Sequence, residues 1–163
     1  FVRIGETEVS SSEAWKETPP VPPFLTPTAA YALFYNNSAT GATYTAGENI
    51  AYQSTLYNTA TADIVNNNGL ITLSGGATGK AYLVNYQVTG ETANDATLAL
   101  AINGTVDSNS EIIPNSATGT SNGSYIVNVP ANSTSTVALR VVSGTVTTAS
   151  PTVGSYLSVI RIA

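Results

Sequence analysis

The side chains that could perform acid–base or metal chemistry in this chain are few, and they are carboxylates. The 163 residues contain no His and no Cys, so imidazole bases, thiol nucleophiles and thiolate metal ligands are all missing. A pair of carboxylates could hydrolyse a glycoside, but the two must lie about 5 to 9 Å apart in a cleft. Nothing in their spacing brings two acids together, so the sequence predicts a protein that is not an enzyme. The acids after Leu25 are Glu48, Asp63, Glu91, Asp95, Asp107 and Glu111.

A calcium site is the other chemistry that these residues could support. Asp95, Asp107 and Glu111 could contribute oxygen ligands, but no loop has the dense Asp and Asn spacing of an EF-hand. Charges solvated in loops are the simpler interpretation, so no metal and no cofactor is predicted. Lys80 begins an expected strand, and the sequence shows no base partner for it.

The charge of the chain is low and its sign is negative. A soluble domain normally has roughly a quarter of its residues charged, whereas here the charged fraction is 9%. The net charge of −5 argues against nucleic acid and anionic membranes as partners, and no apolar run approaches the ~20 residues of a membrane span. The surface must therefore present hydroxyls and amides to water, or be buried in part against copies of the same chain. This composition favours a structural or binding module.

Residues 1–24 differ from the rest of the chain. They hold four of the ten acids and the only Trp. The run from Ser10 to Glu13 has the spacing of a capping box and could begin one helical turn, and the prolines that follow at 19–23 form a stiff spacer. We expect an N-terminal arm and proline-rich linker over residues 1–24, and one domain over residues 25–163.

The elements that position the side chains of this domain are β-strands. Apolar and polar residues alternate in short runs, separated by Gly and Asn-Gly turns, and nothing supports a long helix. Eight short antiparallel strands predict an all-β fold, a jelly-roll sandwich of two antiparallel sheets. The expected strands are residues 30–36, 51–56, 69–74, 80–89, 97–103, 124–129, 136–143 and 155–162.

The first and last expected strands are apolar on both faces. In the first, Tyr31, Leu33 and Tyr35 oppose Ala32 and Phe34. A strand of this kind needs cover on both faces, and without helices another subunit is the simplest cover. A monomer whose tyrosine hydroxyls keep the face hydrated is the alternative. The candidate interface residues are Tyr31, Leu33, Tyr35, Tyr156, Ile160 and Ile162.

Five stretches, taken in order, resemble a known group of proteins. They are residues 30–36 (AYALFYN), 70–84 around the LITL and GKAYLV runs, 98–104 (LALAING), 130–144 and 155–162. They are similar to the C-terminal domains of collagen-like exosporium glycoproteins of spore-forming Firmicutes (the BclA type), which share the trimeric jelly roll of the C1q and tumour necrosis factor families. The chain departs from the group in having no Gly-X-Y tract, and residues 1–24 have no counterpart.

The resemblance implies a homotrimer and a mechanical role. The expected function is trimerisation and display at the tip of a collagen-like filament, extracellular and on a spore or cell surface. The alternative is a trimeric tip of a phage fibre or bacterial adhesin that binds a receptor or glycan. Tyr44, Tyr52 and Tyr57 lie near expected loops and could stack on sugars, or equally pack at the rim of the domain. An exposed aromatic cluster would favour the alternative, and a smooth Thr, Ser and Asn surface would favour the scaffold.

Overall fold

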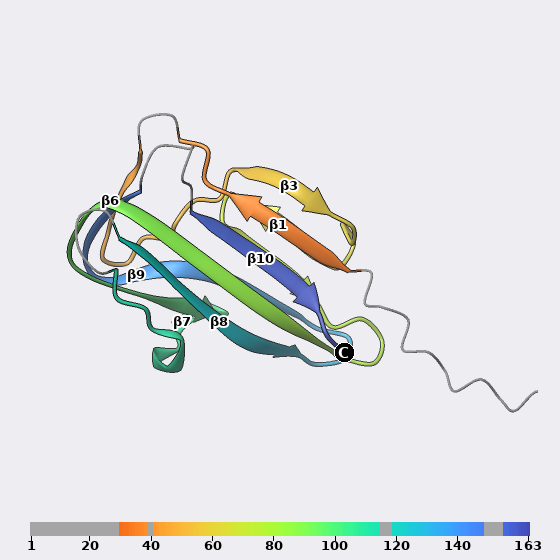
Figure 1. The fold of residues 1–163 in the computed structure, drawn as a ribbon. Helices are drawn as coiled ribbons and strands as arrows, with labels where there is room; N and C mark the ends of the chain where they lie inside the picture. Colours follow the sequence, from red (N-terminus) through yellow and green to blue (C-terminus); the bar gives the residue numbers. More distant parts are fainter. Residues whose placement is uncertain (1–29, 39–40, 115–118, 149–154) are drawn as a thin grey trace, which may run out of the picture.

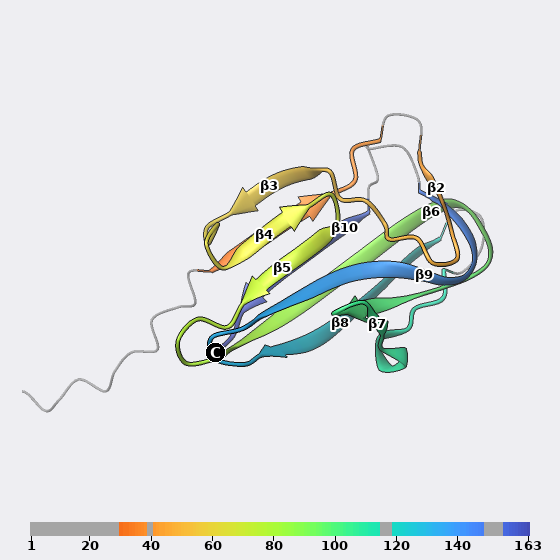
Figure 2. The same ribbon diagram turned by 180° about the vertical axis from the view of Figure 1, so that it is seen from behind.

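Two antiparallel β-sheets lie face to face in the structure, as Figures 1 and 2 show from opposite sides. The computed structural model describes residues 30–38, 41–114, 119–148 and 155–163. Within these residues the regular elements are ten strands and one turn of 3-10 helix. The expected all-β jelly-roll sandwich is therefore confirmed, whereas the expected arm and linker over residues 1–24 lie outside the described residues.

The first sheet brings the two ends of the domain together. Its strands, in order, are β3 (Ser54–Asn58), β1 (Tyr31–Tyr35), β10 (Tyr156–Arg161), the first half of β6 (Lys80–Ile102) and β8 (Thr120–Val129). Tyr31 of β1 lies opposite Ile160 of β10, and Tyr35 lies opposite Tyr156. The first and last strands are thus neighbours in the middle of one sheet.

The second sheet is built around β9 (Thr134–Thr148). One edge of β9 pairs with the second half of β6, and the other edge pairs with β5 (Leu70–Ser74) and then with β2 (Thr43–Thr45). The sheet is completed by β4 (Ile64–Asn67) beside β5 and by β7 (Thr105–Val106) beside β6, followed by the 3-10 turn η1 (Ser108–Ser110).

Strand β6 belongs to both sheets, which the sequence did not predict. Residues 80–89 and 97–103 were expected as two strands, but they form one strand that pairs with β8 and then with β9. The register shifts after Gly90 and again after Asn94, and Asp95 adopts a positive φ of 47°. Such β-bulges bend a strand and increase its twist. The residues that break the alternation therefore carry the chain from one sheet to the other instead of ending the strand.

Smaller differences concern strand ends and a missed hairpin. Strand β3 begins three residues after the expected 51–56, and β9 extends beyond the expected 136–143 at both ends. Strands β2 and β4 were not predicted. The expected strand 69–74 begins inside a turn, because Asn68 and Gly69 both have positive φ and join β4 to β5 in the manner of a type I′ hairpin. A Cβ on Gly69 would lie 2.3 Å from the carbonyl oxygen of Ile50, so this turn requires glycine.

The core fills the space between the sheets. Every second residue of β6 from Tyr82 to Val88 points inward, as the alternation predicted, and meets apolar residues of β5 and β9. Because side chains alternate across a strand, the residues between them point away from the core. The buried core includes Phe34, Ile71, Leu73, Tyr82, Val84, Tyr86, Val88, Leu98, Leu100, Val137, Leu139, Val141, Leu157 and Val159.

Candidate functional site

The outer face of the first sheet collects the side chains that the sequence predicted as an interface. Tyr31 is 45% exposed and Ile160, its partner across the β1–β10 pair, is 37% exposed. Tyr35 and Tyr156 lie opposite one another and are half-buried, as is Leu33. Ile162 follows the end of β10 and is exposed. The structure thus places all six residues on or beside the two adjacent central strands, with their outward sides uncovered in the single chain.

Further apolar residues extend this set across the sheet. The β10–β6–β8 register places Ile160 beside Leu83, and Leu83 beside Ile126, which is 52% exposed. On the other side, exposed Tyr57 of β3 lies opposite Leu33. The sequence did not predict these contacts, although Leu83 lay on the correct face of its alternating run. These neighbours could be predicted only from the order of the strands in the sheet, which hydrophobic periodicity does not show. We call Tyr31, Leu33, Tyr57, Leu83, Ile126 and Ile160 the apolar end of the outer face.

The other end of the same face is lined by amides and hydroxyls. Asn85 of β6 donates a hydrogen bond from Nδ2 to the Ser158 hydroxyl of β10 at 3.2 Å, and Ser124 of β8 lies on the other side of Asn85. A shallow hollow of about 340 Å³ opens here. We call this region the amide end; its hollow is lined by Asn85, Tyr86, Asn122, Gly123, Ser124, Tyr156 and Ser158.

Glycine at position 123 is required beneath this hollow. Gly123 lies opposite Tyr86 in the β6–β8 pair, and a Cβ there would lie 2.5 Å from the tyrosine ring. The Tyr86 hydroxyl donates to the Ser110 carbonyl at 2.6 Å, so the ring has little freedom to move away. The ring of Tyr86 therefore occupies the space that a side chain at position 123 would need.

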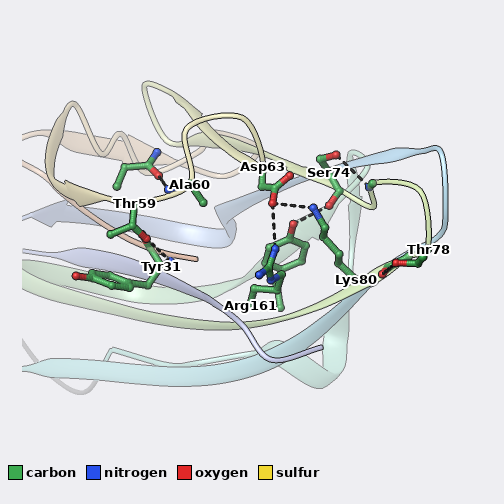
Figure 3. A network of polar contacts seen from close by, with 12 residues as sticks. Tyr31, Thr59, Ala60, Asp63, Ser74, Thr78, Lys80 and Arg161 are labelled. Atoms are coloured by element: carbon green, nitrogen blue, oxygen red, sulfur yellow. Dashed lines mark hydrogen bonds and ion pairs between the residues drawn. The ribbon is translucent and has the colours of Figure 1, made fainter. Parts of the chain in front are cut away.

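The charged residues of these strands turn away from the outer face. Lys80 and Arg161 occupy positions in line with inward-facing Tyr82. Both meet the carboxylate of Asp63, which precedes β4 in the other sheet, at 2.7 Å from Lys80 Nζ and 3.3 Å from Arg161 Nη1. Figure 3 shows Asp63 between the two cations. The sequence showed no base partner for Lys80; the structure gives it Asp63 as an ion-pair partner, and the two ion pairs join the two sheets at one end of the sandwich.

The acids considered for calcium serve other purposes or lie apart. Asp107 is the N-cap of η1 and accepts hydrogen bonds from the Asn109 amide and the Tyr125 hydroxyl. The Tyr125 hydroxyl, followed by the Asn109 amide, lowers the pKa of Asp107 below its ordinary value. Asp95 and Glu111 are exposed. In the part of the chain that the structure describes, no three His, Cys, Asp or Glu side chains gather as a metal site requires.

Two of the three tyrosines suggested for sugar stacking are in the core. Tyr44 and Tyr52 are buried, and the Tyr44 hydroxyl accepts a hydrogen bond from Asn36 Nδ2 at 3.0 Å. These two tyrosines are not available to stack on sugars, because the segment after β2 runs along the edge of β9, where the Ile50 amide donates to the Leu139 carbonyl. Only Tyr57 of the three is exposed, and it belongs to the apolar end of the outer face.

Comparison with known proteins shows the fold and no closer relationship. No protein-family model matches the sequence, and no curated protein matches it. Among solved structures, the Eiger TNF of S. frugiperda is 13% identical, covering 82% of this chain and 92% of its own, with a TM-score of 0.60. The vertex protein P5 of PRD1 is 12% identical, with coverages of 83% and 99% and a TM-score of 0.55.

A third similar structure is the globular domain of the zebrafish complement 1qA protein. It is 12% identical, covers 83% of this chain and 98% of its own, and has a TM-score of 0.54. Among the described residues there is no helix with the length and apolarity to cross a membrane. The similarity to these three structures gives the described domain a C1q/TNF-like jelly-roll fold. The likeness to the exosporium group rests on sequence motifs alone.

Proposed function

We propose that this domain is a non-enzymatic module that assembles into a homotrimer through the outer face of its first sheet. The observation that carries the proposal is the face itself, which is apolar at one end, uncharged throughout its described positions, and built around the first and last strands of the domain. An obligate assembly of this kind buries more than about 2,000 Å² in total. The six residues predicted as an interface lie where such contacts would centre.

The more specific role is trimerisation and display at the tip of a collagen-like surface filament on a spore or cell. Support for it comes from the five sequence stretches that resemble the exosporium glycoproteins, together with the C1q/TNF-like fold of the described domain. A compact trimer with few charges and short turns would hold three chains in register and withstand proteases outside the cell.

A trimeric tip of a phage fibre or adhesin, which binds a receptor or glycan, is the second candidate. The similarity to a phage vertex protein and the exposed Leu56 of the edge strand β3 favour it. The two candidates share the trimer and differ in whether the outside of the assembly binds a ligand. Binding of the trimer to an oligosaccharide array would favour the second candidate, and absence of binding would favour the display role.

The shared claim is tested by placing a charge on the proposed interface. In Ile160→Asp, the carboxylate would be buried without a partner among apolar residues, which costs several kcal/mol in such an environment. We expect the trimer to dissociate in light scattering at micromolar concentration, while circular dichroism keeps the β spectrum. Val65→Asp is the matched control, because Val65 is exposed on β4 of the other sheet and should leave the trimer intact. Equal masses for both variants and the wild type would refute the proposed interface.

A further inference from the structure

The chemistry of the outer face carries an inference about which partner it accepts; this inference rests on the self-association proposed above. Identical chains around a symmetry axis bring a residue near that axis against its own copies. A carboxylate or ammonium there meets a like charge, which is repulsive. An amide or hydroxyl both donates and accepts hydrogen bonds, so it can pair with an identical group. Neutral, two-way hydrogen-bonding groups are therefore suited to a face that must recognise itself.

The outward positions of the first sheet are uncharged at every described residue. The five strand segments contain two charged residues, Lys80 and Arg161, and both turn inward to Asp63. The side chain of Lys80 is 17% exposed and that of Arg161 is 32% exposed. Outward positions are filled by Tyr, Leu, Ile, Ala, Ser, Thr, Asn and Gln alone. A face evolved for a charged partner would present the opposite charge, and this one presents none.

The amide end lies on the three adjacent strands β10, β6 and β8. Asn85 lies on β6, with Ser158 of β10 on one side and Ser124 of β8 on the other. One of its two amide hydrogens is used by the Ser158 hydroxyl, while the hollow of about 340 Å³ beside it opens outward. When the apolar end is buried in an assembly, the polar groups of this row also lose their contact with water. They then need other hydrogen-bond partners.

We propose that the row formed by Asn85, Ser124 and Ser158 pairs, directly or through trapped water, with the same row of two further copies of this chain. The apolar end supplies the main drive to associate, and the amide end selects identical copies in one register. A single buried amide layer has this effect in coiled coils, where it fixes partner number and register at some cost in stability. The occupant of the hollow is then a second copy of the chain.

The test is Asn85→Asp, which replaces an amide by a carboxyl of nearly the same shape. At pH 7.5 three carboxylates would meet around the axis, and we expect association at least about 100-fold weaker than that of the wild type. An isolated Asp has a pKa of about 3.9, and repulsion between like charges raises it. The lost association should thus return below about pH 4, to within about threefold of the wild type measured at the same pH.

The carboxylates already present in the chain are common to the wild type, the variant and the control, so comparison with the wild type at the same pH isolates the carboxyl introduced at position 85. The neighbouring strands carry Tyr156 and Tyr125, whose hydroxyl donates to Asp107, and the cations of the sheet, Lys80 and Arg161, are paired with Asp63. The control is Asn67→Asp, because Asn67 is exposed on β4 in the other sheet. Asn67→Asp should associate as tightly as the wild type at pH 7.5 and at pH 3.5. Sedimentation velocity gives the mass, and circular dichroism verifies the fold.

The outcomes separate this inference from the proposed function. A wild type that is monomeric contradicts the proposed function itself. If the wild type is a trimer and Asn85→Asp associates equally tightly at pH 7.5, the amide row does not contact the same row of the other copies. The inference then fails, while the proposed function stands. It also fails if folded Asn85→Asp stays dissociated at pH 3.5, or if Asn67→Asp dissociates too. Retention of the trimer by Asn85→Asp with loss of oligosaccharide binding would assign the hollow to a sugar.

Discussion

Replacement of Tyr52 by Phe should stabilise this protein, contrary to the usual effect of a core substitution. Tyr52 is fully buried, and its hydroxyl has no hydrogen-bond partner among the described residues. Burial, and after it the neighbouring Tyr44, raises the pKa of this phenol above its ordinary value. An unpaired buried polar group costs about 1–3 kcal/mol, and Phe removes it while keeping the ring. We expect the free energy of unfolding to rise by about 1–2 kcal/mol.

Two other buried tyrosines provide matched controls with the opposite sign. The Tyr82 hydroxyl donates to the Ser74 carbonyl and the Tyr86 hydroxyl to the Ser110 carbonyl, both at 2.6 Å. Replacement of either by Phe removes a hydrogen bond worth about 0.5–1.5 kcal/mol and leaves a carbonyl without its donor. Both variants should therefore be less stable than the wild type by about 1 kcal/mol or more.

Thermal unfolding at one protein concentration measures these differences. A concentration must be fixed because the melting temperature of an assembly depends on it. For a domain of this size 1 kcal/mol corresponds to about 2–4 °C, so Tyr52→Phe should melt about 2–8 °C above the wild type and the two controls below it. If Tyr52→Phe melts as low as the controls, its hydroxyl has a partner such as a buried water, and the reasoning from an unpaired group is refuted.

The ion pairs and the phenols give two further predictions. Asp63→Asn leaves Lys80 and Arg161 without their carboxylate. Because both cations are partly exposed, the cost should lie between the values for surface and buried ion pairs. We expect the free energy of unfolding, measured with urea, to fall by about 1–3 kcal/mol. A loss under 0.5 kcal/mol would mean that the cations are fully hydrated. Stability should be nearly constant from about pH 5 to 8, where no His titrates. Burial raises the pKa of Tyr82 to about 12, so the stability that depends on its neutral phenol is complete below about pH 10 and lost as pH rises through 12. Hydrogen bonding lowers the pKa of Asp107, so its contribution is lost as pH falls below about 4. Melts over pH 3–12 check both limits, and a transition near neutrality would contradict them.

The sequence was informative where a period of two extends over several residues. The inward alternation from Tyr82 to Val88 predicted the core face of β6, because one face of a sheet must be apolar when it packs on another sheet. The same reasoning identified the first and last strands as apolar on both sides, and the structure shows Tyr31 and Ile160 paired and exposed.

The sequence was least informative where distant segments meet. Asp63 and Arg161 are separated by 98 positions, and only the topology that places the start of β4 over the ends of β6 and β10 brings them together. The continuity of β6 through Gly90 and Asp95 was missed for a local reason, because a β-bulge and a turn use similar residues. The extension of the outer face to Ile126 depends on strand order, which hydrophobic periodicity does not encode.

The mass of the wild-type protein in solution tests the central claim most directly. Sedimentation velocity over a range of micromolar concentrations, at pH 7.5 and at physiological salt, gives the mass without any variant or ligand. Self-association through the outer face of the first sheet predicts a single species of three times the chain mass, with no monomer at the lowest concentration. A single species with the mass of one chain throughout the range would contradict it.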